Sequence, residues 1–268
     1  MPLAGNMSPR RGPRGVMLIT QQRVAYLGLL GNLSTRVFGA IAVYLPVDAP
    51  CFEIRRQGGD WEPADFAVIP PYEHHHIRSE GKLVICLLLE MESVDVDAAM
   101  MFLTTGAAEI AARIRFALAH LQATDSWRDS VRLDFDELFF GRRLPARELD
   151  RRIAAVIDRV CADPAAHFSV AELSRICKLS ESRFIHLVKS QIGTTFRCFC
   201  AWKRARSFLA YANATISATE VALDAGYPDS THFRHSIRKF YGCKPTDIFS
   251  GSRRLDIIRP TGTDLPKN

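Results

Sequence analysis

The sequence predicts an α+β protein built from an N-terminal antiparallel β domain with trailing helices and a C-terminal all-α domain. Three observations lead to this prediction. Short apolar stretches with a period of two fill residues 16–96. From about residue 97 the apolar period becomes helical. Residues 169–193 are then repeated, with closely similar spacing, at residues 217–242.

Composition and length bound the class of protein. The 268 residues suit two domains, and 47% hydrophobic with 24% charged residues is ordinary for a water-soluble protein with a core. The chain has no apolar run of membrane-spanning length, and its N-terminus lacks the shape of a signal peptide. Its seven scattered cysteines indicate reduced thiols. We therefore expect a cytoplasmic protein with no membrane partner.

Four strand candidates punctuated by proline and glycine predict a small antiparallel barrel or sandwich. These candidates are residues 36–45, 51–56, 66–70 and 83–90.

A helical pair is predicted to follow, over residues 97–141. Its apolar stripe comprises Ile110, Ile114, Ala117, Leu118 and Leu121. Residues 98–103 are apolar almost all round, which predicts that they are buried. The pair could pack against the β domain or against a second copy of the chain as a dimer interface, and we prefer the β domain. After a linker, a further helix is expected over residues 146–161.

The repeated unit has the pattern of a helix-turn-helix. Each copy opens with Ser-x-x-Glu, at Ser169 and Glu172 and again at Ser217 and Glu220, which is the pattern of a capping box. A short helix, a turn and a second amphipathic helix ending at glycine follow. A helix over residues 195–211 is expected to join the two copies.

The predicted organisation can now be given for the whole chain. In order, it comprises a disordered basic tail (1–15), a β domain (16–96), a helical pair (97–141), a linker (142–148), a double helix-turn-helix domain (149–254) and a flexible tail (255–268).

The second helix of each unit presents polar, imidazole and basic side chains on the face opposite its apolar stripe. In the first unit these are Ser182, Arg183, Ile185, His186 and Lys189. In the second unit they are Thr231, His232, Arg234, His235, Arg238 and Lys239. Such groups suit base edges and phosphate oxygens. We expect Arg234 to bond guanine, Ile185 to touch a thymine methyl, and Lys189 and Arg238 to meet phosphate.

Charge and spacing favour double-stranded DNA as the partner. Residues 150–268 carry a net charge of +8, against −2 for residues 1–149. A 17-residue connecting helix would be about 25 Å long and could hold two helices at successive major grooves, about 34 Å apart. Two alternatives stay open. The units could pack as a plain helical bundle, or they could bind a protein partner with little dependence on salt.

Residues 150–254 resemble the DNA-binding domain of the AraC/XylS transcription regulators. The resemblance rests on Glu220-Val-Ala, Ala225-Gly-Tyr, Phe233, Arg238-Lys-Phe-Tyr-Gly and Lys244-Pro. It implies seven helices, a rigid central helix, and control of promoters together with RNA polymerase. It also implies a cupin-like antiparallel β-barrel at the N-terminus, serving a small-molecule effector or homodimerisation.

The chain departs from the family pattern at two places. Lys178 stands in the first turn where Gly226 stands in the second, so that turn must place a side chain in a tight spot. His186 and His235 stand where the family usually has arginine, which predicts a contact with DNA that is either weaker or dependent on pH.

A histidine cluster supports an alternative function. In a strand His74 and His76 would point the same way, with Glu80 four residues beyond, which is a ligand pattern of metal-binding cupins. The alternative is therefore a metal-dependent cupin-type enzyme, or an effector-binding module using His74 and His76. Such enzymes need a further histidine on a later strand, and the next one is His120, in a helical region. We expect no metal, no cofactor and no enzymatic activity, and histidines that line a pocket or the surface.

Overall fold

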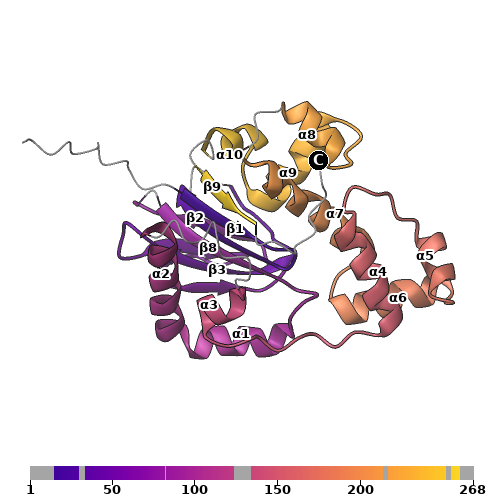
Figure 1. Ribbon diagram of the computed structural model, residues 1–268, viewed down its shortest axis with the longest axis horizontal. Helices are drawn as coiled ribbons and strands as arrows, with labels where there is room; N and C mark the ends of the chain where they lie inside the picture. The colour runs from indigo at the N-terminus through magenta and orange to yellow at the C-terminus, as the bar shows by residue number, and fades with distance from the viewer. Residues whose placement is uncertain are drawn as a thin grey trace, which may run out of the picture.

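The computed structural model describes residues 15–29, 34–81, 83–123, 134–213, 217–251 and 255–259. The basic tail predicted for residues 1–15 lies outside this range up to residue 14. The fold is α+β, as expected, with a β domain beside a helical domain (Figure 1). No helix in the described part of the chain is both long and apolar enough to span a bilayer.

The β domain contains two sheets. The larger has the strand order β6-β3-β8-β2-β1-β9, and the smaller has the order β5-β4-β7. All neighbouring strands are antiparallel except β1 and β9. The strands are β1 (Gly15–Ile19), β2 (Arg23–Leu29), β3 (Ala40–Pro46), β4 (Phe52–Arg56), β5 (Trp61–Ala64), β6 (Ala67–Ile69), β7 (His75–Arg78), β8 (Leu83–Glu90) and β9 (Leu255–Ile258).

Both faces of the large sheet are covered. Because successive side chains point to opposite faces, one set of alternate residues, such as Leu18 and Val43, packs against helices α1 (Val96–Thr105), α2 (Ala107–Ala123) and α3 (Phe135–Phe140). The other set, such as Ile19 and Tyr44, shares a core with the small sheet and the C-terminal helices. Figure 1 shows α1, α2 and α3 on the side of the sheet away from α8, α9 and α10.

The helical pair predicted over residues 97–141 is three helices in the described residues, α1, α2 and α3, and all three pack on the chain's own β domain. All five residues of the stripe in α2 are buried in the core shared with the sheet. The prediction that residues 98–103 are buried is wrong in part, because Met101 is 70% exposed. Only Ala99 and Leu103 of α1 are buried, since a helix on a flat sheet turns a single stripe inward.

Seven α-helices follow in the described C-terminal part, as the family resemblance implies. They are α4 (Arg151–Ala162), α5 (Val170–Ile176), α6 (Glu181–Ile192), α7 (Phe196–Ser207), α8 (Ala218–Asp224), α9 (Ser230–Tyr241) and α10 (Pro245–Gly251). The helix expected over residues 146–161 starts later, because the Asp150 carboxylate accepts from the Arg152 amide and caps α4 there.

The flexible tail predicted for residues 255–268 is contradicted at its start. Leu255–Ile258 form β9, which pairs in parallel with Gly15 to Leu18 of β1. Leu255 and Ile258 are buried, one on each side of the sheet, so their burial and the β1 edge hold the strand in place. Residues 260–268 lie outside the described part.

The two domains are joined by a buried ionic cluster. Glu90, at the end of β8, accepts from Trp202 Nε1 at 2.8 Å and pairs with Lys203 Nζ at 2.6 Å and Arg206 Nε at 2.6 Å. Lys203 also binds Glu92. Burial would raise the pKa of Glu90, but Lys203 and Arg206 hold it below its ordinary value. The cluster therefore pairs two carboxylates with two cations and fixes α7 on the β domain.

Candidate nucleic-acid interface

Helix α6 presents the residues predicted for the first unit. Ser180 caps it, accepting from the Arg183 amide at 3.3 Å, and Gly193 ends it in the left-handed conformation. Phe184 and Val188 are buried against α4, α5 and α7. This burial turns the five predicted contact residues outward, and all five are exposed: Ser182, Arg183, Ile185, His186 and Lys189.

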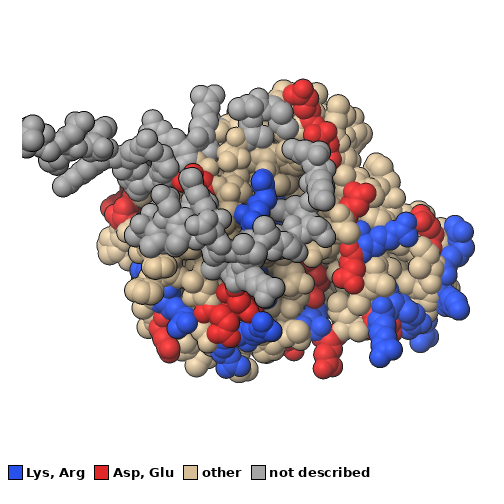
Figure 2. Space-filling model, in the orientation of Figure 1, with Lys and Arg blue, Asp and Glu red and all other residues tan. Residues whose placement is uncertain are grey.

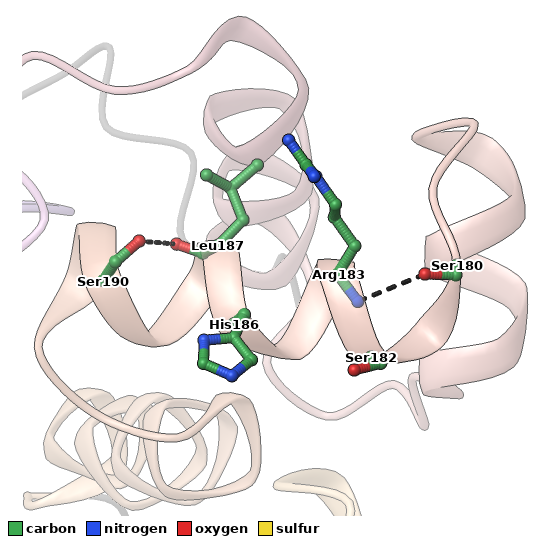
Figure 3. A pocket seen from close by; sticks show the side chains of 6 residues that line it. All are labelled: Ser180, Ser182, Arg183, His186, Leu187 and Ser190. Carbon is green, nitrogen blue, oxygen red and sulfur yellow. Dashed lines mark hydrogen bonds between the residues drawn. The ribbon is translucent and has the colours of Figure 1, made fainter.

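A shallow groove follows α6 (Figure 3). Its lining includes three of the predicted residues, Ser182, Arg183 and His186, and three that sequence reasoning missed, Ser180, Leu187 and Ser190. Figure 3 shows Arg183 and Leu187 on one side of the helix and Ser182 and His186 on the other. Ile185 and Lys189 are exposed but do not line the groove.

Helix α9 presents the residues predicted for the second unit. Phe233, Ile237 and Phe240 are buried, which leaves the predicted set exposed: Thr231, His232, Arg234, His235, Arg238 and Lys239. Two of these are held by their own helix. Asp229, the N-cap, contacts His232 Nδ1 at 2.8 Å, and Arg234 Nε donates to the Ser230 carbonyl at 3.1 Å. The amide of His232 and its ring lower the pKa of Asp229.

The sequence held a signal for the N-caps that the prediction did not use. Ser180 and Asp229 are residue types preferred at this position, and they immediately precede α6 and α9, respectively.

The N-termini of α5 and α8, the first helices of the two units, are capped differently. Ser217 and Glu220 form the predicted capping box. At Ser169 the prediction is wrong, because its side chain makes no capping hydrogen bond. Glu172 instead lies 3.6 Å from Arg159 Nη2 of α4, so its carboxylate is turned toward another helix.

The tight spot predicted for the side chain in the first turn is not found, because Lys178 is exposed. Lys178 has a φ of 54° and Gly226 a φ of 75°, so both occupy the left-handed region. A Cβ at Gly226 would lie 2.2 Å from the Ala165 carbonyl oxygen, which explains why the second turn needs glycine.

The element between the units is shorter than predicted. Helix α7 has 12 residues, or about 18 Å, and Phe208–Tyr211 form a 3₁₀ turn in place of its expected continuation to residue 211. The ring of Phe208 packs 5.3 Å from those of Phe233 and Phe249, and the tighter turn accompanies this burial.

Basic side chains are unevenly spread on the surface. Figure 2 shows Lys and Arg gathered over α4, α5 and α6, whereas Asp and Glu mark the region of α8. The first unit therefore offers the more positive face in this view.

The second unit is tied to the β domain by the end of α9. The Ser34 amide donates to the Gly242 carbonyl at 2.8 Å, and the Val37 amide donates to the Phe240 carbonyl at 3.2 Å. A Cβ at Gly242 would lie 2.4 Å from the Ser34 carbonyl oxygen. The orientation of α9 is therefore set in part by residues 34–38.

The histidine cluster does not form the metal pattern that the alternative function needs. The inward residue is His75, which is 1% exposed, whereas His74 and Glu80 are exposed and His76 lies against Trp61 with ring centres 5.0 Å apart. The register of β7 thus turns the middle histidine into the core. In the described part of the chain no three His, Cys, Asp or Glu residues are grouped as a metal site.

Comparisons with known proteins agree with this geometry. Residues 173–250 match a family described as a helix-turn-helix domain. Over 81 residues the chain is 36% identical to the probable transcriptional regulator LumQ of Photobacterium leiognathi, covering 29% of this chain and 32% of LumQ. The match thus spans about a third of that relative.

Solved structures are similar over most of the chain. ToxT from Vibrio cholerae O395 superposes with a TM-score of 0.55 at 9% identity, covering 90% of this chain and 99% of ToxT. A second ToxT structure, bound to (E)-4-(8-methylnaphthalen-1-yl)but-3-enoic acid, gives 0.53 at 9% identity, covering 85% and 98%. At such identities the similarity establishes a shared fold.

Proposed function

We propose that this chain is an AraC/XylS-type regulator that controls transcription by binding promoter DNA with α6 and α9. One observation carries the proposal. Two helices of the same length, in a repeated unit, each bury an apolar stripe and expose a polar and basic face. A helix of this kind fits the major groove, where polar side chains meet base edges and basic ones meet phosphates.

Each recognition helix has its own part in the proposal. Arg183, Ser182 and His186 along the α6 groove contact one major groove, with Ile185 against a methyl and Lys189 at phosphate. Arg234, released from Ser230, reads a base in the next groove, while Arg238 and Lys239 neutralise phosphates. The shared core between the domains supports a further proposal, that the β domain senses an effector and changes the pose of α9.

The domain type is one that acts by binding, and we propose that this chain is not an enzyme. RNA polymerase is the expected partner at the promoter, and the cytoplasm is the expected compartment. The exposed side chains Met101 and Phe116 on α1 and α2 are the proposed contact with a second copy of the chain.

A gel shift with DNA from the chain's own promoter region tests the proposal. Arg183→Ala and Arg234→Ala should each weaken specific binding by about 1–3 kcal/mol, because each removes a charged contact in a groove. Arg115→Ala, which removes an exposed arginine from α2, is the matched control and should bind normally.

The salt dependence separates DNA binding from the protein-partner alternative. Affinity should fall steeply between 50 and 200 mM salt, because bound phosphates release counterions. Equal binding by the Arg183→Ala and Arg115→Ala variants, together with a flat salt response, would refute the assignment of α6.

A further inference from the structure

Arg204 of α7 contacts both helix-turn-helix units at once. Its Nε donates to the Pro164 carbonyl at 3.3 Å and its Nη2 donates to the Ala166 carbonyl at 3.2 Å, in the loop that leads from α4 into the first unit. Its guanidinium carbon lies 5.7 Å from the centre of the Tyr227 ring, in the turn between α8 and α9 of the second unit. One planar group therefore joins a loop of the first unit to the turn of the second.

The same loop and turn also meet through their backbones. A Cβ added to Gly226 would lie 2.2 Å from the Ala165 carbonyl oxygen and 2.7 Å from the Ala165 Cα, so this approach needs glycine. The neighbouring Tyr227 is buried, and its hydroxyl donates to Ser236 Oγ of α9 at 2.8 Å. A displacement of the turn would thus move α9 as well. We call Arg204, residues 164–166 and residues 226–227 the inter-unit contact.

Helix α7 and the inter-unit contact constrain different motions. Phe199 of α7 is buried in the core of the first unit, whereas Trp202 and Ala205 are buried in the core that contains the second unit, and Figure 1 shows α7 between the two. Packing on one helix sets the distance between the units along its axis. A contact beside the helix, from loop to turn, resists rotation of one unit around that axis. The inter-unit contact therefore sets the rotation of α6 relative to α9.

We propose that Arg204 is a positioning residue that makes the protein select one spacing between the two halves of its DNA site. This inference rests on the proposed function, in which α6 and α9 enter successive major grooves. Those grooves lie about 10 base pairs apart, so each inserted base pair turns one half of the site by roughly a tenth of a turn. Units held by the inter-unit contact cannot follow that rotation, whereas units joined by α7 alone can.

Gel shifts with the full chain test the inference, on the site that footprinting maps in its own promoter region and on copies with one base pair inserted between the halves. For the parent chain the insertion should weaken binding at least about tenfold, because one helix loses its base contacts. For Arg204→Ala it should weaken binding less than about threefold, because the second unit can follow the rotated half. Arg197→Ala, which removes an exposed arginine of the same helix, should keep the ratio of the parent chain. A tenfold ratio in Arg204→Ala overturns the inference.

Arg204→Lys separates positioning from charge. Lysine keeps the positive charge but has no rigid plane that bridges two carbonyls and stacks on a ring. It should therefore lose the selection of spacing as Arg204→Ala does. If lysine preserves the ratio, Arg204 acts only as a charge and the inference is wrong. A parent chain that binds both spacings equally overturns it as well, with α6 and α9 left in their roles. A parent chain that binds no promoter DNA refutes the proposed function, on which this inference depends.

A second variant reaches the inter-unit contact from the other side and leaves Arg204 in place. The added Cβ of Gly226→Ala forces the turn away from Ala165, so this variant should also lower the ratio. Gly193→Ala is the matched control, because its φ of 77° is close to the 75° of Gly226 while its Cβ meets only the end of Met91 at 3.7 Å. Thermal unfolding shows which variants are folded at the assay temperature. Loss of stability alone weakens binding to both spacings alike, so an unchanged ratio in a folded Gly226→Ala variant contradicts the inference.

Discussion

Gly193 and Gly242 end α6 and α9 in the same left-handed conformation but in different surroundings. A Cβ on Gly193 would meet only the end of the Met91 side chain, at 3.7 Å, whereas on Gly242 it would strike the Ser34 carbonyl at 2.4 Å. Alanine at Gly193 should therefore cost about 1 kcal/mol of unfolding free energy, from backbone strain alone. Alanine at Gly242 should cost clearly more. Urea unfolding of both variants measures the difference, and equal losses would mean that Ser34 yields without cost.

His75 gives the protein a dependence of stability on pH. Its pKa is about 3 in the folded chain and near 6.5 when unfolded, so only the unfolded state takes up the proton as the pH falls from about 6.5. The contribution of His75 to the free energy of unfolding is fully present above about pH 6.5. It is lost as the pH falls toward 3, by up to about 1.4 kcal/mol per pH unit. His75→Gln should flatten the stability profile between pH 6.5 and 4.5, while His74→Gln, altered at an exposed neighbour, should keep the slope of the parent chain.

At the scale of single helices and strands, the sequence predicted the features that depend only on neighbouring residues in the chain. The stripe of α2 and the exposed faces of α6 and α9 follow from spacing and residue type, and the structure confirms them. The sequence-based prediction failed where a residue or strand far away in the chain determines the local structure. Glu172 faces Arg159 instead of capping its own helix, and Leu255–Ile258 become a strand because the edge of β1 is available. The contacts of α6 and α9 with DNA stay predictions.

The position of α7 depends on the carboxylate of Glu90. Replacing it with Gln leaves Lys203 and Arg206 buried beside a neutral group, and removing one partner of such a cluster costs about 3–5 kcal/mol. Glu90→Gln should lower the urea midpoint accordingly and speed proteolysis between the domains. Glu62→Gln, at an exposed position of β5, is the control. A midpoint equal to that of the control would show that α7 is held by apolar packing alone.

At the scale of the whole molecule, the second unit shares a core with the β domain, whereas α4, α5 and α6 pack in a core of their own. Trp202 and Tyr241 pack against Phe38, with ring centres 5.7 and 5.6 Å away, and the Arg206 guanidinium donates to the Thr20 and Arg23 carbonyls. None of these pairs is visible in a local pattern, because their members are separated by well over a hundred residues. For the same reason the sequence predicted which faces of α6 and α9 are exposed. It did not predict how the helical domain packs on the β domain.

The pairing of β9 with β1 has a practical consequence for anyone who dissects the protein. A fragment that stops before Leu255 leaves the backbone of β1 open along one side, and bare strand edges of this kind recruit other chains. A fragment without the helical half also uncovers the aromatic surface around Phe38. Such fragments should aggregate on expression more readily than the full chain, in which β9 covers the edge of β1 and the short β9 becomes the edge strand.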